Sequence, residues 1–240
     1  MNPVFNNLLK SRMIGLISAV PFESAEILRP MERKRTVRSG IKTGAIEGKE
    51  VSLACSGIGI ANAAMAVTLL SEIIKPRCIL FFGIGGAYPH SGLSIGEVAA
   101  ASEEIYADCG INTGGGIAGF EEIGFPLLKK GNKKYFNRFP LSKKLVLKAK
   151  SAGISSGVFL TVCAASRSRG RALSLEGDFG SPLVENMEGA AAAHAALACG
   201  IPLLEIRGIS NMAGDNPSKW RIKEGAANCQ RAALEILRLL

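Results

Sequence analysis

Residues 184–211 read VENMEGAAAAHAALACGIPLLEIRGISN, and this stretch decides the fold class. Its first part is rich in alanine, a strong helix former, and predicts a helix over 184–199. After a turn with glycine and proline, LLEIRGIS predicts a largely buried strand over 203–210. A helix that leads into a buried strand through a short turn is the repeating unit of a parallel α/β sheet.

The rest of the chain alternates in the same way. Strands are predicted over 13–20, 78–82, 95–101 and 157–163, helices over 60–74, 141–152 and 223–240, and a hairpin over 44–55. This order predicts a three-layer α/β/α fold with a central, mostly parallel mixed sheet. Because the sequence has no internal repeat and no linker, we expect one domain over 13–240, preceded by an extension over 1–12.

The net charge of +9 comes from one part of the chain. Residues 123–175 hold 12 Lys/Arg and no acid, which leaves 17 Lys/Arg against 20 acids elsewhere. The segment 129–150, KKGNKKYFNRFPLSKKLVLKAK, is either a solvated loop and helix face or an attractant for an anionic ligand or surface. It lacks zinc-finger spacing and a repeated pattern of aromatic residues, so we expect no nucleic-acid partner.

Cysteine and histidine usage limits the chemistry further. The six cysteines contain no CxxC pair, which is typical of buried thiols in a reducing compartment such as the cytoplasm. With two histidines, we expect no metal site. The longest apolar run, 189–204, is interrupted by His194, Gly200 and Pro202, so we expect no membrane span.

Ligands of such sheets bind beyond the carboxyl ends of the strands. Glu23 follows the first predicted strand in SAVPFES, where a partly apolar turn could raise its pKa toward that of a general base. The alternative is a surface glutamate that begins a helix.

Two glycine clusters, SGIGIAN (56–62) and FFGIGGAYP (81–89), are each expected directly after a strand. Glycines there let a ligand approach the backbone, and two neighbouring clusters favour a nucleoside-sized pocket over bare turns. Neither is a GxGxxG, because Asn62 stands where the third glycine would be, so a dinucleotide site is disfavoured.

The stretch 184–211 adds further candidates. Glu185 and Glu188 are three apart and are expected on one side of the first helical turn, either as a helix-starting pair or as a carboxylate that grips a vicinal diol. His194, among alanines, is expected to be packed rather than catalytic. Arg207 needs an acidic partner if it is buried. The amide of Asn211 carries a donor and an acceptor suited to the edge of a heterocycle.

The order of these motifs resembles the nucleoside phosphorylase/nucleosidase superfamily over nearly the whole chain from Met13. The resemblance rests on Glu23, the SGIG turn, the GxGG strand end, the NMEG helix start and RGISN. Within the superfamily, GIGGAYPHSGLSIGEV, EEIYADCG, EEIGFPLL, VENMEGAA and RGISN are similar to the futalosine hydrolase subgroup of menaquinone biosynthesis. The resemblance implies a nucleoside phosphorylase-like fold, hydrolysis of an N-ribosidic bond, no cofactor and a homo-oligomer of two or more chains.

The resemblance also implies a role for each matching residue. Glu23 activates the attacking water, Met187 and Glu188 hold the ribose, Arg207 lies near water and ribose, and Gly83, Gly85 and Gly86 form the substrate-binding strand end. Two positions depart from the adenine-specific members: Asn211 replaces an aspartate that protonates purine N7, and Gly83 replaces a serine. We expect the glycine-rich loop 110–126 to cover the 5′ side of the substrate, and the basic segment is a candidate for attracting the carboxylate of futalosine.

Asn211 favours a 6-oxopurine for a physical reason. Hypoxanthine presents two acceptors, O6 and N7, to which an amide N–H donates, whereas an aspartate would face O6 with a lone pair. Because an unpaired polar group in such a site costs about 1–3 kcal/mol, the base should be a 6-oxopurine, hypoxanthine or guanine, rather than adenine. Three alternatives remain: a purine nucleoside phosphorylase with Arg29, Arg38 and Arg77 as candidate phosphate ligands, a methylthioadenosine-type nucleosidase, and a non-catalytic nucleoside-binding module.

Overall fold

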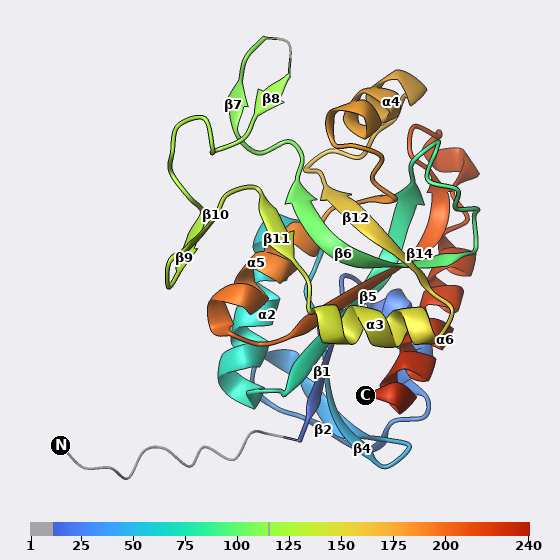
Figure 1. Cartoon of the computed structure of the whole chain (residues 1–240). Helices are drawn as coiled ribbons and strands as arrows, with labels where there is room; N and C mark the ends of the chain where they lie inside the picture. Colours follow the sequence, from blue (N-terminus) through green and yellow to red (C-terminus); the bar gives the residue numbers. More distant parts are fainter. Residues whose placement is uncertain (1–11, 115) are drawn as a thin grey trace, which may run out of the picture.

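The computed structural model describes residues 12–114 and 116–240 (Figure 1). Residues 1–11, most of the predicted extension, lie outside the described part. One sheet contains β1 (Ile14–Ser18), β2 (Glu32–Thr36), β3 (Lys42–Ile46), β4 (Lys49–Cys55), β5 (Cys78–Ala87), β6 (Val98–Tyr106), β11 (Arg138–Pro140), β12 (Ser155–Thr161), β13 (Val184–Asn186) and β14 (Leu203–Met212). Two separate hairpins pair β7 (Ile111–Asn112) with β8 (Ile117–Ala118), and β9 (Leu128–Lys130) with β10 (Lys133–Tyr135).

Helices cover both sides of this sheet (Figure 1). They are α1 (Ala25–Leu28), α2 (Ile60–Ile74), α3 (Lys143–Ser151), α4 (Arg169–Asp178), α5 (Gly189–Cys199) and α6 (Ile222–Leu239), with short 3₁₀ turns η1 (Pro21–Ser24), η2 (Arg38–Gly40) and η3 (Pro217–Lys219). Helices α2 and α5 pack together on one side, and α6 contacts α1, α3, β5 and β14 on the other. The three predicted layers are therefore confirmed.

The sheet is mixed, as predicted, and its centre is parallel. Strands β4, β1, β5 and β14 are parallel neighbours, and β14 runs antiparallel to β6. Strand β6 is parallel to β12, β12 to β13, and β13 returns antiparallel to the end of β5. Strands β5, β14, β6, β12 and β13 thus close into a ring. The carboxyl ends of β1, β5 and β14 lie beside one another at one edge.

Several predicted elements match closely. The helix over 60–74 has the predicted bounds, and 44–55 belongs to an antiparallel hairpin of β3 and β4. The strand expected over 95–101 lies further along the chain, since β6 begins at Val98 and ends at Tyr106.

The second glycine cluster does not follow the strand, contrary to the prediction, but belongs to it. Strand β5 continues through GIGGA to Ala87, and Gly83, Gly85 and Gly86 lie inside it. A side chain at Gly85 would approach the Glu185 carbonyl at 3.0 Å and Arg207 Cβ at 3.3 Å. The glycines therefore let β13 and β14 pack closely around β5, which is the physical reason that the strand does not end at Phe82.

The helix predicted over 184–199 is also wrong at its start. Residues Val184–Asn186 form β13, and α5 begins only at Gly189. Asn186 ends the strand and caps the helix, since its side-chain oxygen accepts the backbone N–H of Glu188 at 2.9 Å and of Gly189 at 2.7 Å. Glu185 therefore lies on a strand and not on the first turn of a helix.

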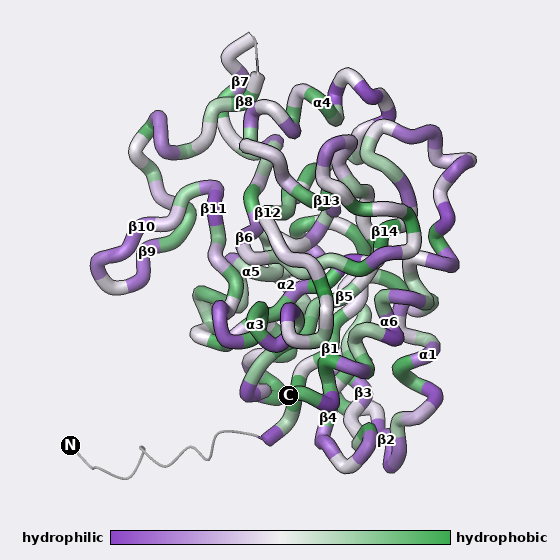
Figure 2. The backbone as a smooth tube through the Cα atoms, turned by 45° about the vertical axis from the view of Figure 1, so that its right-hand side comes forward, coloured by the Kyte–Doolittle hydropathy of each residue, from purple (hydrophilic) through white to green (hydrophobic). Residues whose placement is uncertain are grey.

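The basic segment 129–150 forms exposed structure around one side of the molecule. It includes most of the β9–β10 hairpin, which projects from the body in Figure 1 and is hydrophilic in Figure 2, and α3. Most of its lysines are exposed. Among the described residues, no helix is both long and apolar enough to cross a membrane. All six cysteines are free thiols.

The contact of α6 with β14 depends on two facing glycines. A Cβ added at Gly208 would collide with the carbonyl oxygen of Gly225 and lie 3.0 Å from Cys229 Cβ. We expect Gly208→Ala to lower the free energy of unfolding by about 1–3 kcal/mol, because α6 must move away from the sheet. The measurement is the midpoint of urea unfolding.

Gly177→Ala in α4 is the matched control, because a Cβ at Gly177 meets no atom within 4 Å. It should leave stability unchanged or raise it by about 0.5–1 kcal/mol. Equal midpoints for the two variants would contradict this account of the α6–β14 contact.

Candidate functional site

A cavity of about 260 Å³ lies at the carboxyl ends of β1, β5, β13 and β14. Its lining combines buried charged side chains with apolar residues. The charged and polar lining residues are Glu23, Glu185, Asn186, Glu188, Arg207, Ser210 and Asn211. Seven of the eight predicted site residues line it, namely Glu23, Gly85, Gly86, Met187, Glu188, Arg207 and Asn211.

Glu23 lies on η1, directly after β1, and is buried. Its Oε2 accepts the backbone N–H of Ala19 at 3.0 Å and of Val20 at 3.2 Å, and its Oε1 accepts that of Ile84 at 2.9 Å. Burial raises the pKa of Glu23 above its ordinary value, while Arg207 and the backbone donors oppose the shift. The predicted direction of the pKa shift is confirmed.

Arg207 lies on β14 and is 1% exposed. Its Nε donates to Glu205 Oε1 at 2.8 Å and its Nη1 donates to Glu188 Oε2 at 3.0 Å, so it has the acidic partners that its burial requires. Nη1 also donates to the Ile84 carbonyl at 3.2 Å, and the guanidinium lies 5.2 Å from the Phe81 ring centroid. These contacts fix its orientation below the cavity.

Glu188 is the N-cap residue of α5 and is buried at the edge of the cavity. Its Oε1 accepts the backbone N–H of Gly59, which belongs to the first glycine cluster, at 3.0 Å. Its Oε2 is the acceptor of Arg207. The carboxylate is thus held from two sides, with lone pairs left for further donors. Met187, which precedes it, is half-buried and lines the cavity.

Asn211 lies at the carboxyl end of β14, as predicted, and is 6% exposed. Its Nδ2 donates to the Met212 carbonyl at 2.9 Å, and its Oδ1 accepts from Ser210 Oγ at 2.8 Å. An amide NH₂ carries two donors, so one N–H remains for a ligand in the cavity.

Gly83 lies beneath the site and does not line the cavity itself. A Cβ there would approach Glu23 Oε1 at 2.8 Å and Arg207 Nη1 at 3.0 Å. A serine at this position would therefore require one of these charged groups to move.

An apolar wall closes the rest of the cavity, and the sequence analysis missed it. It contains Val20, Phe22, Ile58, Trp220 and Ile222. Trp220 is the only tryptophan of the sequence, and it follows nine residues after Asn211. This position, shortly after a strand end, could have indicated that Trp220 lies at the site. Asn186 was not predicted as a site residue either, although it stands within the NMEG motif.

Several singled-out residues lie elsewhere or act differently. Glu185 reaches the cavity from β13, but its oxygens accept from Ser166 N at 2.7 Å, Ser166 Oγ at 2.6 Å and Tyr88 Oη at 3.3 Å, so it is not paired with Glu188. His194 stacks on Phe139 with ring centroids 4.4 Å apart, as expected for a packed residue. The candidate phosphate ligands do not line the cavity; these are Arg29, Arg38 and Arg77.

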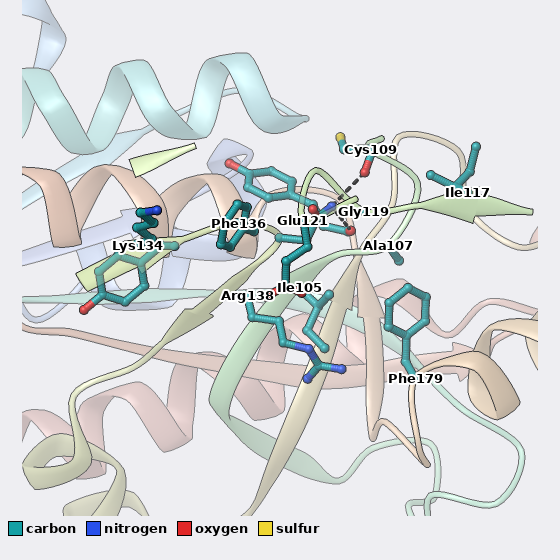
Figure 3. A pocket seen from close by; sticks show the side chains of 13 residues that line it. Ile105, Ala107, Cys109, Ile117, Gly119, Glu121, Lys134, Phe136, Arg138 and Phe179 are labelled. Carbon is teal, nitrogen blue, oxygen red and sulfur yellow. Dashed lines mark hydrogen bonds between the residues drawn. The ribbon is translucent and has the colours of Figure 1, made fainter. Parts of the chain in front are cut away.

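The loop 110–126 does not cover this cavity within one chain, contrary to the prediction. Three residues of this loop, Ile117, Gly119 and Glu121, line a second cavity of about 280 Å³ instead. Figure 3 shows this second cavity, with Arg138 and Phe179 also on its wall. It lacks the buried, mutually bonded charges of the first cavity, which is why we place the candidate site at the strand ends.

One group near the second cavity has metal-ligating atoms, outside the candidate site. The ligand atoms of Asp108, Cys109 and Cys163 lie within 4.8 Å of one another. The guanidinium of Arg171 lies 3.6 Å from Asp108 Oδ2, so the carboxylate already faces a cation.

Comparisons with known proteins agree with this geometry. A family model described as "Phosphorylase superfamily" matches residues 13–239. A futalosine hydrolase of Thermus thermophilus is 40% identical over 184 residues, which cover 76% of this chain and 79% of that protein. A 5′-methylthioadenosine/S-adenosylhomocysteine nucleosidase of Maridesulfovibrio salexigens is 27% identical over 234 residues, which cover 95% of this chain and 99% of that protein.

Solved structures show the same fold. The 5′-methylthioadenosine/S-adenosylhomocysteine nucleosidase of Neisseria meningitidis, in complex with methylthio-immucillin-A, matches with a TM-score of 0.82 at 23% identity, over 95% of this chain and 100% of that one. The predicted nucleoside phosphorylase-like fold is therefore confirmed. The prediction of an N-glycosyl hydrolase is confirmed at the level of reaction class, because the named relatives are hydrolases and nucleosidases.

Proposed function

The chain belongs to the phosphorylase superfamily, and from that premise we propose that it is a purine nucleoside N-ribosyl hydrolase. Its proposed substrate is futalosine, which it cleaves to hypoxanthine and dehypoxanthine futalosine. The observation that carries the substrate assignment is Asn211, an amide with a free N–H at the cavity wall. The 40% identity to a futalosine hydrolase supports it.

In this mechanism Glu23 is the general base. Its carboxylate lies at the cavity edge, held by three backbone N–H groups, so a water bound between it and the ribose would be aimed at C1′. A raised pKa strengthens a carboxylate as a base. Water adds to C1′ as the bond from C1′ to purine N9 breaks.

The ribose is held by the residues around Glu188. The carboxylate of Glu188 accepts from two sugar hydroxyls with its remaining lone pairs, and Met187 packs beneath the ring. Arg207 fixes Glu188 and lies on the same side of the cavity as Glu23. The net negative charge of these carboxylates also suits the cationic, oxocarbenium-like sugar of the transition state.

The base is read at Asn211. The free N–H of Nδ2 donates to O6 or N7 of hypoxanthine, and both atoms are acceptors. An amide is a poor acid, so the departing purine is stabilised by hydrogen bonds and receives its proton through water. No metal or organic cofactor takes part in this scheme.

Hydrolysis is favoured over phosphorolysis by the charges of the cavity. Among the described residues that line it, Arg207 is the one arginine, and its guanidinium is already paired with Glu205 and Glu188. A phosphate would meet Glu23, Glu185 and Glu188 instead. The methylthioadenosine-type alternative is disfavoured by Asn211.

The biological setting is part of the same proposal. A futalosine hydrolase acts in menaquinone biosynthesis in the cytoplasm, as the sequence resemblance implies. We also infer a homo-oligomer, for which exposed apolar side chains supply contact surface. These include Ile58, Met65, Leu69, Ile123 and Phe125.

The direct test is to incubate the protein without phosphate with inosine, futalosine and methylthioadenosine, and to identify the released base. We expect hypoxanthine from futalosine, at a rate that added phosphate does not raise. Turnover that requires phosphate would indicate a phosphorylase. Adenine release at an equal rate would indicate a methylthioadenosine-type nucleosidase, and binding without any turnover would indicate a binding module.

A second prediction concerns pH. Because burial raises the pKa of Glu23, kcat/KM for futalosine should fall on acidification at a pH above the ordinary glutamate value of about 4.3, as the carboxylate takes up a proton. Glu23→Gln should lower kcat by about 10²–10⁴-fold, the usual contribution of a general base.

Glu26→Gln is the control for this series, since Glu26 lies one helical turn away and does not line the cavity. This variant should keep the wild-type kcat, and its kcat/KM should fall over the same range of acidic pH (the acid limb of the pH profile). A Glu23→Gln variant with near-normal turnover would remove Glu23 from the mechanism.

A further inference from the structure

Two carboxyl groups meet in the interior beneath the site. Glu104 on β6 and Glu205 on β14 are both 0% exposed, and their side chains lie next to each other. Both lie against Gly189 at the start of α5, where an added Cβ would collide with Glu104 Oε1 and Glu205 Oε2. Two carboxylates cannot share a hydrogen bond unless one of them carries a proton.

The positive charge near Glu104 and Glu205 is too small to compensate two ionised carboxylates. Arg207 is the cation in contact, and it also faces Glu188 and, across Gly83, Glu23. The other titratable groups that face Glu104 are Tyr88 at the end of β5 and Tyr106 on β6, and neither is a cation. A buried carboxylate without its own cation is strongly unfavourable, so one of the pair is neutral.

The neighbouring donors identify the place of the proton. Thr161 Oγ1 accepts the backbone N–H of Ala190 at 2.7 Å, and its one hydrogen goes to Glu104 Oε2 at 2.7 Å in preference to Asn186 Oδ1 at 3.3 Å. The side-chain oxygen of Asn186 is held by backbone N–H groups, so its NH₂ faces Glu104 Oε1 at 2.6 Å. Glu104 therefore has both oxygens satisfied as acceptors.

Glu205 is different at one oxygen. Its Oε1 accepts from Arg207 Nε at 2.8 Å, but its Oε2 is buried and receives no donor from any described group, unless Glu104 supplies one. A proton on Glu104 Oε1 would satisfy this atom and leave the charge of Glu205 on the side of Arg207. The opposite arrangement would place the charge on Glu104, away from the cation.

We infer that Glu104 is a neutral carboxylic acid whose O–H donates to Glu205 Oε2, and that this bond positions Arg207 by holding Glu205 as its carboxylate partner. Burial and the adjacent charge of Glu205 raise the pKa of Glu104 well above its ordinary value, which agrees with the assignment. Glu104 touches neither the cavity nor a reacting atom. It is a positioning residue, which acts on Glu188 through Glu205 and Arg207.

The catalytic consequence rests on the proposed function, but the protonation state does not. The test therefore begins with infrared spectroscopy of the folded protein at pH 8, where the C=O stretch of a protonated carboxyl group is separate from carboxylate bands. We expect such a band in the wild type and its loss in Glu104→Gln. Glu103→Gln is the matched control, because the adjacent Glu103 pairs with Arg138 near the surface, and it should keep the band.

The kinetic arm compares Glu104→Gln with Glu205→Gln for futalosine hydrolysis. Glutamine is neutral and can donate to Glu205, so Glu104→Gln should keep kcat/KM within about threefold of the wild type, with the same acid limb. Glu205→Gln should lower kcat/KM about ten- to hundredfold, because it removes the charged partner of Arg207. Its acid limb should move to lower pH, since an uncompensated Arg207 favours ionised Glu23.

Two results would overturn the inference. One is an infrared spectrum of Glu104→Gln identical to that of the wild type, which would mean that Glu104 is ionised. The other is an acid limb that moves to lower pH in Glu104→Gln, because removing a true negative charge would do so. If the wild type hydrolyses no nucleoside, the proposed function fails while the infrared result still decides the protonation state.

Discussion

The burial of one guanidinium sets the arrangement of this site. Arg207 sits on the central strand β14 with almost no exposure, and its charge has to be met by carboxylates from other elements. Glu205 meets it from the same strand and Glu188 from the start of α5. Strand β5 can approach because it carries glycine at position 83, which leaves room for the guanidinium and Glu23 together.

The charge of Arg207 also acts on the pKa of Glu23. Desolvation raises the pKa of Glu23, and Arg207 with the backbone N–H groups of Val20 and Ile84 limits the increase. Asn186 links this balance to the interior, because it caps α5, donates to Glu104 and accepts from Arg207 Nη2 at 3.3 Å. Glu23, Glu188 and the buried pair Glu104 and Glu205 are therefore joined through Arg207, Asn186 and the Ile84 backbone.

The sequence predicted the layers and the strand-end residues, because periodicity and strand ends are local signals. It failed where distant segments decide the structure. The predicted strand over 78–82 was expected to end before its glycines, but β13 and β14 pack against these glycines and extend β5 to Ala87. Glu185 was assigned to a helix because residues three apart share one side of a helix, and only pairing with β12 and β5 makes it a strand residue. Glu104 gave no local signal, since its importance depends on Glu205, about a hundred residues later.

Recognition of a 6-oxopurine by Asn211 is the central claim, and one substitution tests it most directly. The quantity is the ratio of kcat/KM for futalosine to that for its 6-amino analogue, measured in the wild type and in Asn211→Asp. The two substrates differ at the purine 6-position alone. The account predicts that the ratio favours futalosine in the wild type and falls about ten- to hundredfold in the variant, because an aspartate faces O6 with a lone pair. An unchanged ratio would contradict it.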